Sequence, residues 1–152
     1  MRLKREKVPV PSWLMLMFRI PTEPSAPRVS AWRKLKRLGA VVLHDAVWIL
    51  PATASTREQL QWLVSEIVDS GGEAMVWRSD VEVGTDESLV KQFCERAGAA
   101  YTDILTELRQ EDPDLTALAR RYQQAKAVDY FHASLGEQVR EALLAAKGRD
   151  DQ

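Results

Sequence analysis

A basic segment between two apolar segments is the feature that most limits how this chain can fold. Residues 28–37 contain five Lys or Arg side chains and no acid. The flanking residues, Trp13–Phe18 and Val41–Pro51, are mostly apolar, and the first of these runs is too short to cross a bilayer. The pattern therefore predicts a basic helix that connects two buried strands.

The residues expected to start and end helices and strands around this segment predict an α+β core. Its elements follow a ferredoxin-like β-α-β-β-α-β order, with both helices on one face of a four-stranded sheet. Ser25 is expected to cap the first helix and Gly39 to end it. Residues 55–58, Ser-Thr-Arg-Glu, resemble a capping box at the start of the second helix, and Gly71-Gly72 follows it. The expected strands are 13–20, 40–43, 47–50 and 73–77.

From Val83 onward the apolar residues recur at helical spacing. Helix starts are expected at Thr85-Asp86-Glu87, at Asp112-Pro113-Asp114 and, after a break near 131–133, at a capping box beginning with Ser134. We expect a C-terminal helical hairpin, which either packs against the sheet or mediates dimerisation. The predicted organisation is a basic flexible arm at 1–11, a ferredoxin-like core at 12–82, a helical extension at 83–147 and a polar tail at 148–152.

Charge is distributed unevenly along the chain. Residues 1–37 contain ten Lys or Arg against two Glu, a net charge of +8, whereas the remaining residues have a net charge of −9. Such polarity favours one surface for a polyanion such as DNA. The alternative is that the basic and acidic parts pair with each other, within one chain or across a dimer.

The reactive side chains are few. A single cysteine, Cys94, excludes an internal disulfide and fits a reducing cytoplasm, and it is expected to be a buried or bystander thiol. His44 and His132 have no second ligand at metal-binding spacing, and no secretory signal precedes the core. We therefore predict a cytoplasmic protein without metal or cofactor. The five tryptophans are expected on core faces: Trp13, Trp32, Trp48, Trp62 and Trp77.

Several segments, in order and spacing, resemble a known family. They are Trp13–Met17, Pro21–Ser25, Arg28–Ala40, Asp45–Pro51, Glu66–Trp77 and Val128–Phe131. This set resembles the N-terminal domain of the ChrB family of chromate-resistance regulatory proteins. In that family the domain normally precedes a second domain, and the pair is associated with chromate-responsive control of an efflux operon. Residues 32–40 are also similar, more weakly, to the central domain of the phenylacetate-pathway repressor family. That domain is itself similar to the small ferredoxin-like nucleases of CRISPR adaptation, and this likeness implies fold more than function.

Together the basic residues and the resemblance predict a transcriptional regulator, a homodimer that contacts DNA phosphates through its basic helix. Six such contacts would give a log–log salt dependence with a slope of about −5 for duplex DNA. The alternative is a non-DNA interaction or oligomerisation module of the same resistance pathway. The predicted DNA-binding residues are Arg19, Arg28, Arg33, Lys34, Lys36 and Arg37, with a mobile arm of Arg2, Lys4, Arg5 and Lys7.

Two further chemistries are less favoured. A metal-dependent nuclease needs converging carboxylates, but Arg19-Ile20-Pro21 follows the first strand, where those relatives place an aspartate, and Asp45 is a turn residue. We therefore predict that the protein is not an enzyme. An oxyanion effector such as chromate would suit the helix start at Ser25–Arg28 with Arg19 nearby, although an ordinary capped helix start is the favoured explanation of that segment.

Overall fold

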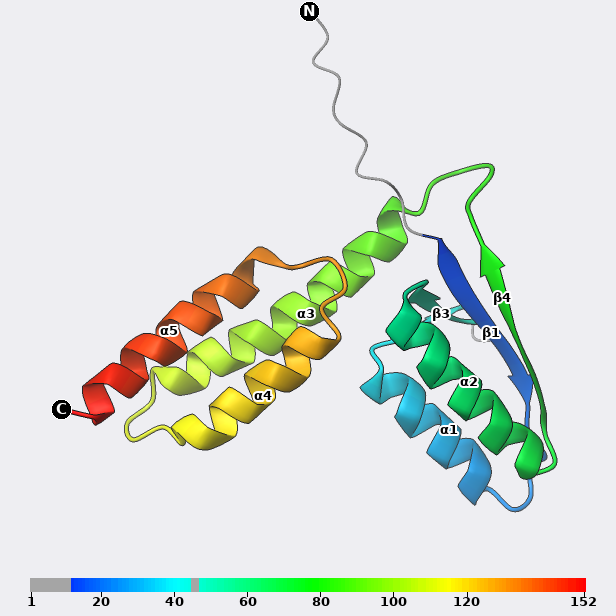
Figure 1. Ribbon diagram of the computed structural model, residues 1–152, viewed down its shortest axis with the longest axis horizontal. Coiled ribbons are helices and arrows are strands. Elements are labelled where there is room, and N and C mark those ends of the chain that lie inside the picture. The colour runs from blue at the N-terminus through cyan, green and yellow to red at the C-terminus, as the bar shows by residue number, and fades with distance from the viewer. Residues whose placement is uncertain (1–11, 45–46) are drawn as a thin grey trace, which may run out of the picture. The chain divides into compact units, whose positions relative to one another are not determined.

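The computed structural model describes residues 12–44 and 47–152, so the predicted basic arm and Asp45 lie outside the described residues. Internal contacts divide the chain into two units, Met1–Gly84 and Thr85–Gln152. Each unit contains its own set of packed elements (Figure 1). No helix in the described part of the chain combines the length and the apolar character needed to span a membrane.

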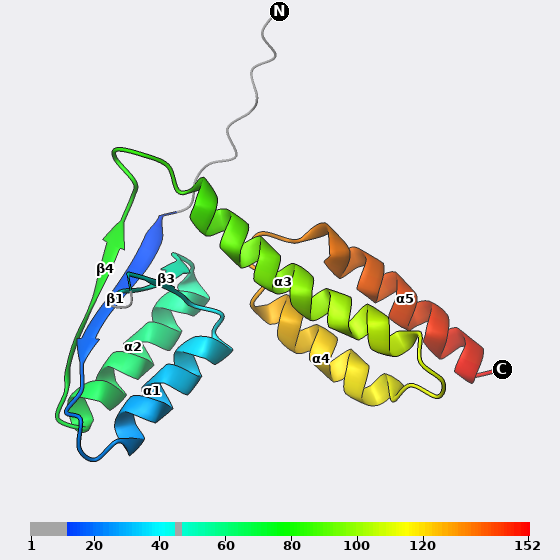
Figure 2. The same ribbon diagram turned by 180° about the vertical axis from the view of Figure 1, so that it is seen from behind.

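The first unit is a four-stranded antiparallel sheet with two helices, which confirms the predicted α+β class. The strand order is β2-β3-β1-β4, which is compatible with a ferredoxin-like arrangement. The two helices lie side by side on one face of the sheet in both views (Figures 1 and 2). In chain order the elements are β1 (Trp13–Arg19), α1 (Ala26–Arg37), β2 (Val41–Leu43), β3 (Val47–Pro51), α2 (Ala54–Asp69) and β4 (Glu73–Ser79).

The register of β1 decides which side chains the helices cover. Leu14 and Leu16 are buried on the helix-covered face, and Leu16 lies opposite Trp48 of β3. Among the described residues, the β1–β3 pairing ends at Leu16 and Trp48, and Met17–Arg19 pair with β4.

The starts of the first two helices differ from the predicted caps. Ser25 precedes α1 as expected, but its side chain makes no capping hydrogen bond. The capping box of α2 is formed by Thr53 and Thr56, two residues before the predicted one, with each hydroxyl accepting from the other residue's backbone N–H. The Thr56 hydroxyl is also within 2.6 Å of the carbonyl oxygen of Pro51, to which it donates. This buried bond to the end of β3 fixes where the helix begins.

The second unit consists of three mutually packed helices, which correspond to the three predicted helix starts: α3 (Glu87–Leu108), α4 (Leu115–Ala127) and α5 (Ser134–Asp150). Their core contains Tyr101, Ile104, Leu118 and Val139, each at most 2 % exposed. The break expected near 131–133 is present between α4 and α5. It allows α5 to turn back and cover the apolar sides of the other two helices.

Two predicted caps in this unit are also corrected. The residue that caps α4 is Asp114, whose carboxylate accepts from the backbone N–H of Ala117 at 3.1 Å, and not Asp112. No side chain caps α5, because the helix begins at Ser134 and its N-cap residue is Ala133, whose methyl group cannot accept a hydrogen bond; Glu137 pairs with Arg140. Local sequence signals thus predicted where both helices lie but not which groups cap their first turns.

The tryptophan prediction is wrong for three of the five residues. Trp13 and Trp48 are buried, whereas Trp32, Trp62 and Trp77 are 52 %, 67 % and 55 % exposed. Trp77 lies opposite Met15 in β4, on the sheet face away from the helices, and Trp62 lies on the outer side of α2. Exposed tryptophans on a small domain are candidates for contact with a ligand or partner.

Candidate nucleic-acid interface

Helix α1 presents its basic residues to solvent because two small or apolar residues hold its other side against the sheet. Ala31 and Leu35, one turn apart, are its buried residues. Arg33 and Arg37 are likewise one turn apart and exposed. Val29 and Trp32, which the sequence pattern assigned to the apolar side, are exposed as well. The surface of α1 is therefore both cationic and aromatic.

Two of the six predicted DNA-binding residues are engaged by acids. The ammonium of Lys34 pairs with the carboxylate of Glu66 on α2, which links the two helices. Arg19 lies 3.6 Å from the carboxylate of Glu73, its direct partner in the β1–β4 register. Strand alternation places Arg19 on the face of the sheet opposite to Phe18, and therefore away from α1.

The other four predicted residues, Arg28, Arg33, Lys36 and Arg37, lie together on α1. No described residue forms an ion pair with Arg28, Arg33 or Arg37. Helical spacing places Arg28, Trp32 and Lys36 on one stripe and Arg33 with Arg37 on the next. The helix thus carries two adjacent cationic stripes, one of which includes an aromatic ring.

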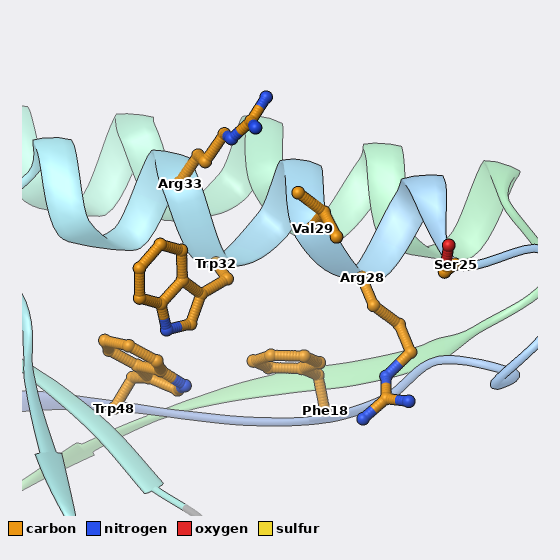
Figure 3. Close-up of a pocket in the computed structure, with 7 residues that line it drawn as sticks. All are labelled: Phe18, Ser25, Arg28, Val29, Trp32, Arg33 and Trp48. Atoms are coloured by element: carbon orange, nitrogen blue, oxygen red, sulfur yellow. The ribbon is translucent and has the colours of Figure 1, made fainter.

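A pocket of about 800 Å³ opens between α1 and the strands, and we call it the aromatic pocket. It lies over the face of the sheet that carries Phe18 and Trp48. Figure 3 shows Trp32 facing Trp48, with the ring of Phe18 beside them. The described residues that line it are Phe18, Ser25, Arg28, Val29, Trp32, Arg33 and Trp48.

The charged groups of the aromatic pocket are all cations. Arg28 extends from α1 towards the strands beside Phe18, whereas Arg33 points away from the rings (Figure 3). The Nζ of Lys36 lies 5.4 Å from the ring centroid of Trp32 and 6.0 Å from that of Trp48. None of the described lining residues is acidic. The pocket therefore combines aromatic faces with positive charge.

Sequence reasoning missed this pocket because it treated Trp32 and Trp48 as core residues. The informative signal was the spacing of Arg28, Trp32 and Lys36, which repeats every four residues along α1. A large ring on a line of cations is typical of a nucleic-acid surface more than of a helix packed in a core. Phe18 carried no comparable signal, because it is one apolar residue in an apolar strand.

The groups considered for oxyanion and metal chemistry are not assembled into one site. Arg19 and Arg28 lie on opposite faces of the sheet, and the hydroxyl of Ser25 makes no capping bond. Within the described residues, no group of three or more His, Cys, Asp or Glu side chains is positioned to hold a metal ion. Burial raises the pKa of the Cys94 thiol, and the negative charge of Asp129 raises it further. This thiol is therefore poorly nucleophilic.

Comparison with known proteins connects the basic helix to a family. Residues 28–107, from α1 through most of α3, match the family described as "Protein ChrB, N-terminal". Protein ChrB of Cupriavidus metallidurans is 28 % identical over 137 residues, a match that covers 81 % of this chain. The chain spans 41 % of the length of that relative. No solved structure matches the chain.

Proposed function

The chain belongs to the ChrB N-terminal family, which is associated with chromate resistance, and from that premise we propose that it is a regulatory domain that binds duplex DNA through α1. The observation that carries the proposal is the set of cations on α1 without acidic partners among the described residues, Arg28, Arg33 and Arg37. Cations without internal partners are available to displace the counterions condensed on DNA.

The proposal fixes how strongly binding should depend on salt. Of the six residues expected to contact phosphates, Lys34 and Arg19 are already paired with acids. The remaining four contacts give an expected log–log slope of about −4 for duplex DNA, whereas six give about −5. A slope close to −4 is therefore the quantitative signature of this surface.

The test is a salt titration of duplex DNA binding with the wild type and the Arg33→Ala/Arg37→Ala double variant. We expect the double variant to bind more weakly at every salt concentration and its slope to be shallower by about 2. Circular dichroism provides the fold check, because both arginines are exposed and the buried side of α1 is unchanged.

The matched control is Arg109→Ala/Arg120→Ala, which removes the same net charge from exposed positions in the helical unit. We expect this control to retain the wild-type slope. Equal losses in both double variants would mean that binding follows overall charge and not α1, and the proposal would then be abandoned. No binding of duplex DNA at low salt would also contradict it.

A second candidate function, self-association, is favoured by the sheet face opposite to the helices. Met17 and Met75 lie directly opposite each other on this face, and Trp77 is two residues further along β4. All three are more than 40 % exposed. Such an apolar cluster on a soluble domain fits an interface, and the occupant we propose is a second copy of the chain. Sedimentation of the wild type and of Met17→Glu/Met75→Glu tests this: a dimer that the variant loses supports it, and a wild-type monomer excludes it.

A further inference from the structure

We propose that the aromatic pocket receives an unpaired nucleobase, with the adjoining phosphates held by Arg28 and Lys36. The inference rests on the proposed function for the class of ligand, because other aromatic anions share this chemistry. It goes beyond that function in assigning a second mode of binding. Duplex DNA contacts the cations of α1 through its phosphates alone, whereas the pocket binds a base that has left the stack.

The walls of the pocket are held in place before any ligand binds. Trp48 is 9 % exposed and is anchored in β3, directly opposite Leu16 of β1. Phe18 is half-buried on the same face of the sheet, and Trp32 approaches from α1 (Figure 3). Because two of the three rings are fixed by sheet packing, a base entering between them loses little binding energy to ordering of the protein.

Trp32 is the pocket ring with the most exposed surface for such a ligand to cover. About half of its surface remains exposed, although large aromatic side chains are stabilised by burial. A planar base stacked on this ring would cover it without requiring any particular sequence, since every base has a π face. The pocket volume, about 800 Å³, leaves room for a base with its sugar.

Charge selects an anionic ligand and orients it along the helix. Arg28 and Lys36 lie on either side of Trp32 and are separated by about 12 Å along the axis of α1. A strand that runs parallel to the helix therefore has a cation on each side of the bound base. The described lining residues include no carboxylate that would repel its phosphates.

Bases within a duplex expose only their edges, so the pocket discriminates by strandedness. Single strands, frayed ends and flipped bases offer the face that stacking requires. The structure thus leads us to expect that the domain binds single-stranded DNA through a stacking ring, Trp32, that contributes little to duplex binding.

The test uses the full chain and a labelled single strand of about 12 thymidines, with affinity measured by fluorescence anisotropy at about 50 mM salt. We expect Trp32→Ala to weaken binding by about 5- to 150-fold, the range found for loss of one base–aromatic stack. Trp32→Phe should retain most of the affinity, and Arg28→Ala should lower both the affinity and the salt slope.

Two controls separate stacking from charge and from altered folding. Trp62→Ala removes another exposed tryptophan, on α2 and outside the pocket lining, and should bind as the wild type does. An abasic strand of the same length keeps the phosphates but offers no ring. The wild type should bind this strand about as weakly as Trp32→Ala binds the thymidine strand.

The outcomes distinguish this inference from the proposed function. If duplex binding depends on Arg33 and Arg37 but the abasic and thymidine strands bind equally well, the pocket inference fails while the proposed function stands. If Trp62→Ala and Trp32→Ala lose the same affinity, the inference is likewise overturned. If neither duplex nor single strand binds, both fail. If the wild type is a dimer and Trp32→Ala is a monomer, the pocket binds a second copy of the chain, and the nucleobase inference is overturned.

Discussion

The hydroxyl of Tyr101 in α3 donates a hydrogen bond of 2.9 Å to Oδ2 of Asp129, in the turn between α4 and α5. Both residues are buried. The same carboxylate accepts from the backbone N–H of Ala133, 3.0 Å from each of its oxygens. One buried acid therefore joins all three helices of the second unit, and it is satisfied because Tyr101 reaches it from the core.

Tyr101→Phe should destabilise the helical unit. The substitution removes one donor from a buried carboxylate, and the expected cost is about 1–3 kcal/mol because the acid keeps only its backbone partner. Urea unfolding followed by circular dichroism measures this cost. The control is Tyr122→Phe, since no hydrogen bond of the Tyr122 hydroxyl is present among the described residues. Equal destabilisation by both substitutions would contradict a specific role of Asp129.

The same pair predicts a loss of stability at high pH. Burial, and secondarily the hydrogen bond to Asp129, raises the pKa of Tyr101 above its usual value near 10. The folded state therefore retains a proton that the unfolded chain releases. This contribution to stability is complete below about pH 10 and is lost progressively as the pH rises towards the raised pKa.

Unfolding midpoints measured between about pH 9 and pH 11 should fall more steeply for the wild type than for Tyr101→Phe. Burial also raises the pKa of Tyr130, but that group is common to both proteins and cancels in the comparison. Parallel pH profiles for the two proteins would show that Tyr101 does not govern the alkaline transition.

Gly136, in the first turn of α5, should not tolerate a methyl group. A Cβ at this position would lie 3.1 Å from two ring carbons and from the hydroxyl oxygen of Tyr101, which Asp129 holds in place. We expect Gly136→Ala to cost about 1 kcal/mol or more by overpacking, despite alanine's higher helix propensity. Gly148→Ala, on the same helix with nothing within 4 Å of the added carbon, should instead raise stability by about 0.5–1 kcal/mol. The midpoints of urea unfolding show whether each substitution raises or lowers stability. A Gly136→Ala variant more stable than the wild type would contradict the close contact.

The order of elements in the first unit could be predicted because it is signalled locally. Apolar runs mark the strands, and Gly39 and Gly71 end the helices in left-handed conformations, with φ of 75° and 89°. The capping residues could not be predicted in the same way. The predicted cap, Ser55, lies inside α2, because the bond from Thr56 to the end of β3 favours a start at Ala54 with Thr53 as the cap.

The cations of the candidate site were visible in the sequence, but their availability was not. Whether Lys34 is free depends on Glu66, 32 residues away on another helix. The aromatic pocket depends on how α1 packs over the sheet, which brings Trp32 to face Trp48. Both properties arise from tertiary contacts, so residue type and spacing identify the helix without defining its ligand surface.

Breaking the Lys34–Glu66 pair should strengthen DNA binding. Glu66→Gln removes an acid from beside α1 and releases Lys34 as a further phosphate contact. We expect tighter binding to duplex DNA at low salt and a slope steeper by about 1. The cost to folding should be small, about 0–1 kcal/mol, because the pair is partly exposed.

Glu58→Gln is the matched control for this substitution. Glu58 is another exposed acid of α2, and no described residue pairs with it. Because it removes the same charge without releasing a lysine, its effect on the salt slope should be negligible. Identical slopes for Glu66→Gln and the wild type would mean that Lys34 does not reach the DNA even when it is free. The contact surface would then be confined to the stripes that contain Arg28, Arg33, Lys36 and Arg37.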